Sequence, residues 1–401
     1  MLFSFFSTLT WAGDFAITNA TVFPIDGPVI EKGHVLVSDG KIKAVGSDIN
    51  IPDGTETIDG SGKFLMPGII DVHSHMGVYP WPEANAHGDG NEASEPVTAF
   101  VRAEDSVKVS DPAFELARAG GVTAVMILPG SANLIGGEAA ILKLRPSRTL
   151  AGMRFEGAPR GIKMACGENP KRVHQKEERG PSTRMGNMAH MRETFQLALD
   201  YRVARSGSNP PPSDHNLETL LEVLDGKIRV HVHCYRQDDI EGIYRVMDHY
   251  GIQVASFQHA LEAYKVRDII IDHKTAIATW PDWWGFKMEA YDATPYNATL
   301  VKQDGGVVAL HSDSGNTVQR MYTEAAKMVR YGVSEVEALE MITLDPAKML
   351  GIEDRVGTLT VGKDADLALF SHHPLDVYTR VEQTWIDGEL VFKREDSADV
   401  P

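Results

Sequence analysis

The stretch Ile69-Ile-Asp-Val-His73-Ser-His75 places two histidines, two positions apart, at the end of an apolar run. Alternate residues of a β-strand point to the same side, so both imidazoles would project from one face where that strand ends. Neutral imidazole is a common metal ligand, and such a pair is a favourable start to a metal site. The alternative is two histidines that only form hydrogen bonds at a strand end. That alternative is the better explanation of a lone histidine; the pair favours the metal site.

Residues 67–351, which include this stretch, alternate short apolar runs with helical periodicity. Strand-helix alternation favours a parallel sheet, and a (β/α)8 TIM-like barrel is typically about 250 residues long. We therefore predict an α/β fold with such a barrel. Strands are predicted at 69–72, 122–128, 162–164, 229–233, 253–259, 275–279 and 307–310, helices at 112–119, 239–250 and 317–331, and loops at 168–184 and 210–212.

The two ends of the chain have hairpin patterns instead. Residues 14–66 contain alternating apolar runs that turn at Asp39-Gly40, and residues 352–395 contain a second set that turns at Asp387-Gly388. Asp-Gly between such runs is a strong hairpin signal. Chain termini often lie close together on a domain surface. We therefore predict one small β-sandwich domain built from 14–66 and 352–395, beside a barrel domain of 67–351.

Side chains with useful chemistry recur at the predicted strand ends. His73 and Lys163 are 90 residues apart, and His233 and His259 are 26 apart. His259 and Asp313 are 54 apart. These spacings are close to whole multiples of one strand-helix unit of roughly 30 residues. The count places His73 and His75 on strand 1, Lys163 on strand 4, His233 on strand 5, His259 on strand 6 and Asp313 on strand 8. Barrel enzymes build their sites at these strand ends, so the register predicts one shared site.

Composition excludes several classes of function. The 401 residues include 39 Lys and Arg and 56 Asp and Glu, which gives a net charge of −17. This negative charge would repel nucleic acid. The two cysteines, Cys166 and Cys234, are too few for a disulfide framework or a multi-thiolate zinc site. Met1 to Gly13 is shorter than the about 20 apolar residues that span a membrane. We interpret it as a gene-start or signal remnant and expect a soluble, cytoplasmic protein, with an exported, processed form as the alternative.

The chain resembles the amidohydrolase superfamily, in particular its imidazolonepropionase-related, prolidase-like branch. The motifs that carry the resemblance are 67–75, Gly161-Ile-Lys163-Met, His233-Cys-Tyr, His259 and Ser312-Asp313, with 343–347 and 356–367 extending it over nearly the whole chain. It implies a metal-dependent hydrolase that cleaves a C–N bond of an amide, peptide-like or lactam substrate. Neutral imidazoles and carboxylates suit zinc, which makes hydroxide available near neutral pH.

The resemblance also implies roles for single residues. Two zinc ions per chain would be bridged by Lys163 after carboxylation by CO2, with Asp313 as the base. The implied metal ligands are His73, His75, Lys163, His233, His259 and Asp313, and the implied catalytic residues are Asp313 and His259. His231 remains an alternative ligand to His233, although His233-Cys-Tyr matches the family's His-Ala-Tyr pattern better.

Two other functions fit the same pattern. The first is a mononuclear deaminase or cyclic-imide hydrolase, imidazolonepropionase-like, in which His259 is the base and Lys163 is unmodified. One metal per chain rather than two would identify it. The second is a non-catalytic amidohydrolase-like scaffold, against which the presence of every expected ligand argues.

Residues beyond the metal set are candidates for substrate binding. Arg236, next to Tyr235, could clamp a substrate carboxylate, because a guanidinium forms two parallel hydrogen bonds with such a group. Pairing of Arg236 with Asp238 or Asp239 is the alternative. We expect a small-molecule substrate, with homo-oligomer formation left open.

Two segments are predicted to form walls of the site. Lys287 and Trp283 belong to the segment after the seventh strand, which holds three of the six tryptophans. Packing between barrel and loop is the alternative role for these rings. The Gly-rich segment 125–137 is predicted to be a substrate-facing loop after the third strand. Arg160 and Arg184 are further cations that we expect on this face.

Overall fold

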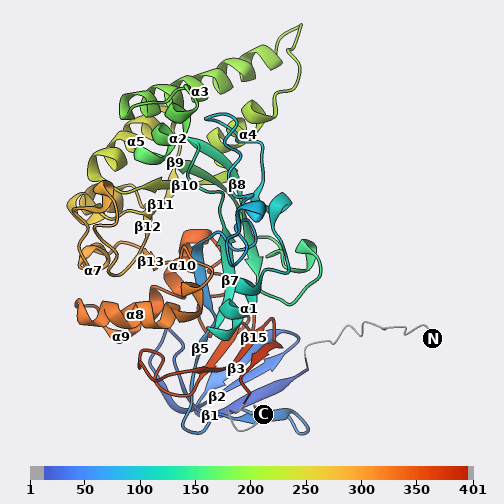
Figure 1. Cartoon of the computed structure of the whole chain (residues 1–401). Coiled ribbons are helices and arrows are strands. Elements are labelled where there is room, and N and C mark those ends of the chain that lie inside the picture. Colours follow the sequence, from blue (N-terminus) through green and yellow to red (C-terminus); the bar gives the residue numbers. More distant parts are fainter. Residues whose placement is uncertain (1–12, 396–401) are drawn as a thin grey trace.

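The computed structural model describes residues 13–395. The remnant predicted at Met1 to Gly13 therefore lies, but for its last residue, outside the described part. Figure 1 shows a sheet of blue and red strands from the two ends of the chain, next to a barrel with helices around it. A TIM-like barrel with a β-sandwich built from both termini is confirmed.

The sheet at the chain ends runs in the order β16-β15-β14-β5-β1-β2-β3, with β4 paired to β1. Its strands are β1 (Phe15–Val22), β2 (Ile30–Ser38), β3 (Lys41–Gly46), β4 (Glu56–Asp59), β5 (Phe64–Pro67), β14 (Leu367–Phe370), β15 (Val381–Ile386) and β16 (Glu389–Lys393). The two halves meet where β5 and β14 pair in antiparallel register. Across the core of this unit, the ring of Phe15 stacks on Trp385 at 5.6 Å. The division at residues 66/67 and 351/352 stays a prediction, since the sheet itself ends at Pro67 and resumes at Leu367.

The barrel has eight strands in chain order. They are β6 (Ile69–Ser74), β7 (Val122–Ile127), β8 (Ile135–Lys143), β9 (Arg160–Ala165), β10 (Ile228–Cys234), β11 (Val254–His259), β12 (Ala276–Thr279) and β13 (Val308–Leu310). Near its closure, the Asp313 N–H donates to the His73 carbonyl at 3.0 Å. The count of strands 1, 4, 5, 6 and 8 made from the spacing is confirmed.

The third barrel strand departs from the prediction. β8 is antiparallel to both neighbours, β7 and β9, in a barrel whose other paired strands are parallel. The segment 125–137 therefore leaves the second strand, and its last residues already belong to β8. A hairpin needs no crossover helix, which removes the usual spacing signal. Gly137 has a φ of 111°, and a Cβ at this position would lie 2.5 Å from the Val101 carbonyl oxygen. A glycine is therefore required here by a bend within β8 and does not mark a loop.

The helices cover the barrel and the ends of its strands. They are α1 (Pro112–Ala119), α2 (Glu168–Lys176), α3 (Arg184–Arg205), α4 (His215–Leu224), α5 (Gln237–Tyr250), α6 (Arg267–Asp272), α7 (Asn297–Gln303), α8 (Met321–Arg330), α9 (Glu335–Glu340) and α10 (Leu344–Leu350). The prediction of a loop over residues 168–184 was wrong for its first half, which forms α2. Pro170 falls in the first turn, where proline is tolerated, and buries itself together with His174. The predicted loop at 210–212 is confirmed.

A buried ion cluster joins the barrel to the sheet of the chain ends. The Lys143 ammonium, at the end of β8, contacts Asp364, Asp366 and Asp387. Arg355 adds a bidentate contact to Asp364. All three carboxylates come from the C-terminal part of the chain, so Lys143 joins the barrel to the sheet, and Arg145 adds a second ion pair to Asp387.

Two further features concern the whole described chain. Cys166 and Cys234 form a disulfide between the ends of the neighbouring strands β9 and β10. Within residues 13–395, the helices are all too short or too polar to cross a membrane.

Candidate metal centre

The first strand delivers two histidine rings in fixed orientations. His73 Nδ1 lies 2.9 Å from the Gln258 side-chain oxygen, and His75 Nδ1 lies 2.8 Å from the Leu128 carbonyl. Because each acceptor takes an Nδ1–H, each ring presents the lone pair of Nε2 to the barrel mouth. Both Nε2 atoms face the Asp313 carboxylate, at 3.6 and 3.4 Å.

Lys163 extends from β9 into the same space. Its Nζ lies 3.4 Å from His73 Nε2, and the residue is 1% exposed. Within residues 13–395 it makes no ion pair, which is unusual for a buried lysine. Burial lowers the pKa of its ammonium, and the Asp313 charge opposes that shift only in part.

On β10 the structure separates the two histidines by depth. His233 stands nearer the strand end, with its ring 4.6 Å from that of His259. His231 lies deeper, where its Nδ1 is 2.8 Å from the Ser256 hydroxyl. Ser256 also accepts from the Gln258 amide at 2.8 Å. His231 is therefore linked to His73 through hydrogen bonds of Ser256 and Gln258.

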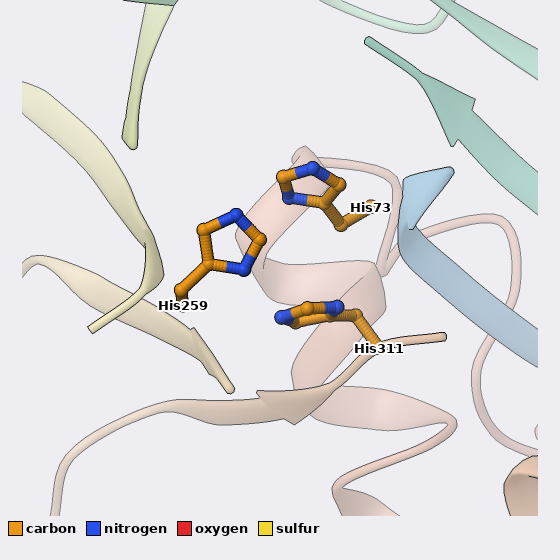
Figure 2. Close-up of side chains that lie close together, drawn as sticks. All are labelled: His73, His259 and His311. Carbon is orange, nitrogen blue, oxygen red and sulfur yellow. The ribbon is translucent and has the colours of Figure 1, made fainter. Parts of the chain in front are cut away.

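His311, which was not among the predicted ligands, joins the cluster. Figure 2 shows the rings of His73, His259 and His311 turned toward one another from three different segments. Their candidate ligand nitrogens lie within 4.8 Å of one another. A signal was present in the sequence, because His311 stands two residues before Asp313, the same spacing as between His73 and His75.

Asp313 completes the arrangement just beyond β13. Its side chain remains 23% exposed and that of His75 21%, so solvent reaches this side of the cluster. Burial raises the pKa of Asp313, while the Lys163 charge opposes the shift. The buried Asp71 carboxylate accepts from the Ser312 hydroxyl and backbone N–H, which holds the β13 end against β6.

The backbone is strained at two of these positions. His259 and Asp313 have φ values of 71° and 48°, in the left-handed region that non-glycine residues rarely adopt. Such outliers concentrate at functional sites, where the surrounding structure holds them in place. Here each turns the chain sharply as a strand ends, with its side chain kept in the cluster.

The donor set fits metal ions. Burial lowers the pKa of His75 to about 3 and that of His73, His233, His259 and His311 well below the ordinary value, so these rings are neutral. Metal ligation requires neutral imidazole. Buried ring nitrogens of His233, His259 and His311 have no hydrogen-bond partner within the described residues. Buried polar atoms are nearly always satisfied, and these neutral nitrogens are free to act as ligands of a metal ion.

The predicted substrate-binding residues are distributed around this cluster. The Tyr235 ring stacks on His259 at 5.1 Å, and the Lys287 ammonium lies 3.9 Å above the Tyr235 ring. Trp283 lies further out, against Trp280.

The arginines are already paired. Arg236 forms two hydrogen bonds with Asp238, at 2.9 and 2.6 Å, which is the alternative weighed above. Its role as a carboxylate clamp stays a prediction. Arg184 pairs with Asp239 and Glu289 beside the cluster. Arg160 begins β9 and so lies at the opposite barrel end, bound to Glu138 and Glu222; its placement on the active face was wrong.

Known proteins share this architecture. The model of the amidohydrolase family matches residues 295–391. An amidohydrolase from Thermotoga maritima MSB8, of solved structure, is 39% identical with a TM-score of 0.89, covering 95% of this chain and 100% of that one. The amidohydrolase tasK of Hapsidospora irregularis is 34% identical over 91% of this chain, which spans only 39% of that protein. An imidazolonepropionase of Mesorhizobium japonicum is 23% identical, over 85% of this chain and 87% of that protein.

Proposed function

This chain belongs to the amidohydrolase family, and from that premise we propose that it is a metal-dependent hydrolase of a carbon–nitrogen bond in an amide, peptide-like or lactam substrate. The observation that carries the proposal is the convergence at one barrel mouth of neutral histidines, Asp313 and Lys163, which has no ion pair among residues 13–395. They come from the ends of several strands, β6, β9, β10, β11 and β13, and buried ring nitrogens of His233, His259 and His311 have no hydrogen-bond partner among the described residues.

Two zinc ions would be held by His73, His75, His233, His259, Asp313 and a carboxylated Lys163. A lysine ammonium repels cations, whereas its carbamate is an anion with two oxygens that can bridge them. Carboxylation is supported by the burial of Lys163 and by its lack of an ion pair within the described residues. Bound zinc would supply Lewis acidity for the scissile carbonyl and for the attacking water.

Asp313 is the proposed base. Its carboxylate, which faces both His73 and His75 and keeps contact with solvent, orients the attacking water and accepts its proton. The same carboxyl group then returns that proton to the leaving nitrogen. His259, whose ring lies 4.5 Å from that of His73, is proposed as a ligand and as a second catalytic residue.

Tyr235, Lys287, Trp283 and Arg236 are the proposed substrate contacts. Lys287 is the best-placed cation, because it sits over Tyr235 and its charge acts on both His233 and Asp313. Its contacts to Glu168 and Glu289, at 3.4 and 3.5 Å, are long and leave the ammonium able to meet a substrate carboxylate. Arg236 would have to release Asp238 first.

Metal removal tests the proposal directly. Protein that hydrolyses N-acyl amino acids or dipeptides should lose that activity on dialysis against a chelator and regain it with added zinc. Activity that survives complete metal removal would contradict the metal-dependent assignment. A screen without turnover of any amide, peptide or lactam would contradict the C–N hydrolase.

A second candidate is a mononuclear enzyme. It is favoured by the compact set His73, His75 and Asp313, whose ligand atoms already lie within 4.8 Å of one another without Lys163. One metal per chain and an unmodified lysine would distinguish it.

A further inference from the structure

The segment that follows β12 carries two layers of aromatic side chains that pack against the candidate metal centre, within residues 280–286. In the inner layer, the Trp280 ring lies parallel to His259 at 4.5 Å and also contacts His311 at 4.6 Å. Trp280 is 5% exposed, because its far face is covered in turn. The cover is Trp283, stacked on Trp280 at 5.0 Å and 10°. A continuous column of three parallel rings thus leads outward from a proposed ligand.

The outer layer consists of Trp283 and Phe286, whose rings stand nearly at right angles; we call this pair the corner. Phe286 stands edge-on to Trp280 at 5.8 Å and at 80° to Trp283, with 6.5 Å between the two centroids. The inner faces of this pair are occupied, yet Trp283 remains 40% exposed and Phe286 53% exposed. A planar group placed here would stack on one ring and meet the other edge to face, the two geometries that aromatic pairs prefer.

A cation sits beside this corner. Phe286 is followed directly by Lys287, whose ammonium covers Tyr235, and Phe286 itself contacts Tyr235 at 6.1 Å. The Tyr235 ring that Lys287 covers also stacks on His259 at 5.1 Å, so the corner, the cation and a proposed metal ligand belong to one site. The complementary ligand is an aromatic ring on a short carbon chain that carries a carboxylate.

We propose that Trp283 and Phe286 bind an aryl group of the substrate, so that the site prefers N-acyl aromatic amino acids or peptides with an aromatic residue over their small aliphatic counterparts. This inference rests on the proposed function for the identity of the scissile bond. The occupied corner would hide two large rings from water, and covering apolar surface is favourable in proportion to the area removed.

The chain supplies a matched control. Trp284 is the same residue type at the next position and is 56% exposed, but it contacts no other aromatic ring within residues 13–395. Truncation of Trp283 and of Trp284 removes the same atoms, and only the first removes the corner.

The experiment compares binding of 3-phenylpropionate and propionate to the purified, zinc-supplemented protein by calorimetry, which needs no turnover. Wild type should bind 3-phenylpropionate roughly tenfold more tightly than propionate. Trp283→Ala should bring the ratio close to one, Phe286→Leu should lower it in part, and Trp284→Ala should leave it unchanged. Equal affinities in wild type, or equal effects of the two tryptophan substitutions, would overturn the inference. Melting curves show whether each variant is folded. If Trp283→Ala does not fold, the comparison is made with Phe286→Leu.

Hydrolysis of N-acetylphenylalanine and N-acetylalanine separates the two proposals. Cleavage of both with equal kcat/KM, and no binding preference, would remove the aryl site and leave the hydrolase. Cleavage of neither, with a Trp283-dependent binding ratio, would remove the hydrolase and leave the aryl site.

Discussion

Lys163 is the residue whose chemistry decides between one metal and two. We predict that Lys163→Ala loses the second metal and most of the activity, because the carbamate bridge is gone. Short carboxylates such as acetate should partly restore both, since they can fill the space left by the side chain. Metal analysis and amide turnover, with and without added carboxylate, are the measurements. Full activity with unaltered metal content would eliminate the binuclear site.

His233 and His231 both extend from β10, at different depths, and substitution of each tests which of them is a metal ligand. His233→Ala should strongly reduce bound metal by removing a ligand. His231→Ala should reduce it much less, since His231 lies deeper and is linked to His73 indirectly, through Ser256 and Gln258. Equal metal loss in the two variants, measured on folded protein, would show that the assignment between the neighbours is wrong.

At the scale of elements, the sequence predicts the strands that carry the ligands better than it predicts what lies between them. Parallel strands need a crossover, so the spacing between His233, His259 and Asp313 contains whole strand-helix units. β8 breaks this rule as an antiparallel hairpin, and its Gly136-Gly137 resembles a loop. α2 was missed because it is polar almost throughout, and tertiary contacts through Pro170 and His174 fix it.

The start of α1 shows how an element holds the site loop. The Asp111 carboxylate caps the helix by accepting from Ala113 N–H at 2.9 Å and also accepts from the N–H groups of Gly77 and Trp81, just beyond His75. Asp111→Ala should lower the free energy of unfolding by about 2 to 3 kcal/mol, since buried donors lose their acceptor. Urea denaturation measures it. Asp214→Ala, at the exposed cap of α4, is the control and should cost about 1 kcal/mol; equal losses would contradict the buried role.

At the scale of the whole molecule, the ion cluster around Lys143 couples the barrel to the composite sheet. Burial alone would raise the pKa of Asp364, but hydrogen bonds from Arg355 and the Lys143 charge lower it to about 2. A folded-state pKa below the ordinary 3.8 means that ionised Asp364 stabilises the fold. That stabilisation is fully present above about pH 4 and is lost as the pH falls toward 2.

Lys143→Met tests this coupling. At pH 7 it should lower the free energy of unfolding by about 3 kcal/mol, because three carboxylates lose their central cation. At pH 3 the loss should shrink, since the carboxylates of the variant can protonate. Lys43→Met removes an exposed lysine whose ion pair is with the exposed Asp39, and it should change stability little at either pH. A Lys143→Met loss that is the same at both pH values would contradict the electrostatic account.

The central claim is a binuclear metal centre, and the metal content of the whole protein tests it most directly. Protein purified without chelators should contain about two zinc-like ions per chain by elemental analysis. A value near one would contradict the bridged centre and favour the mononuclear enzyme. A folded protein that binds none when zinc is supplied would contradict the metal centre altogether.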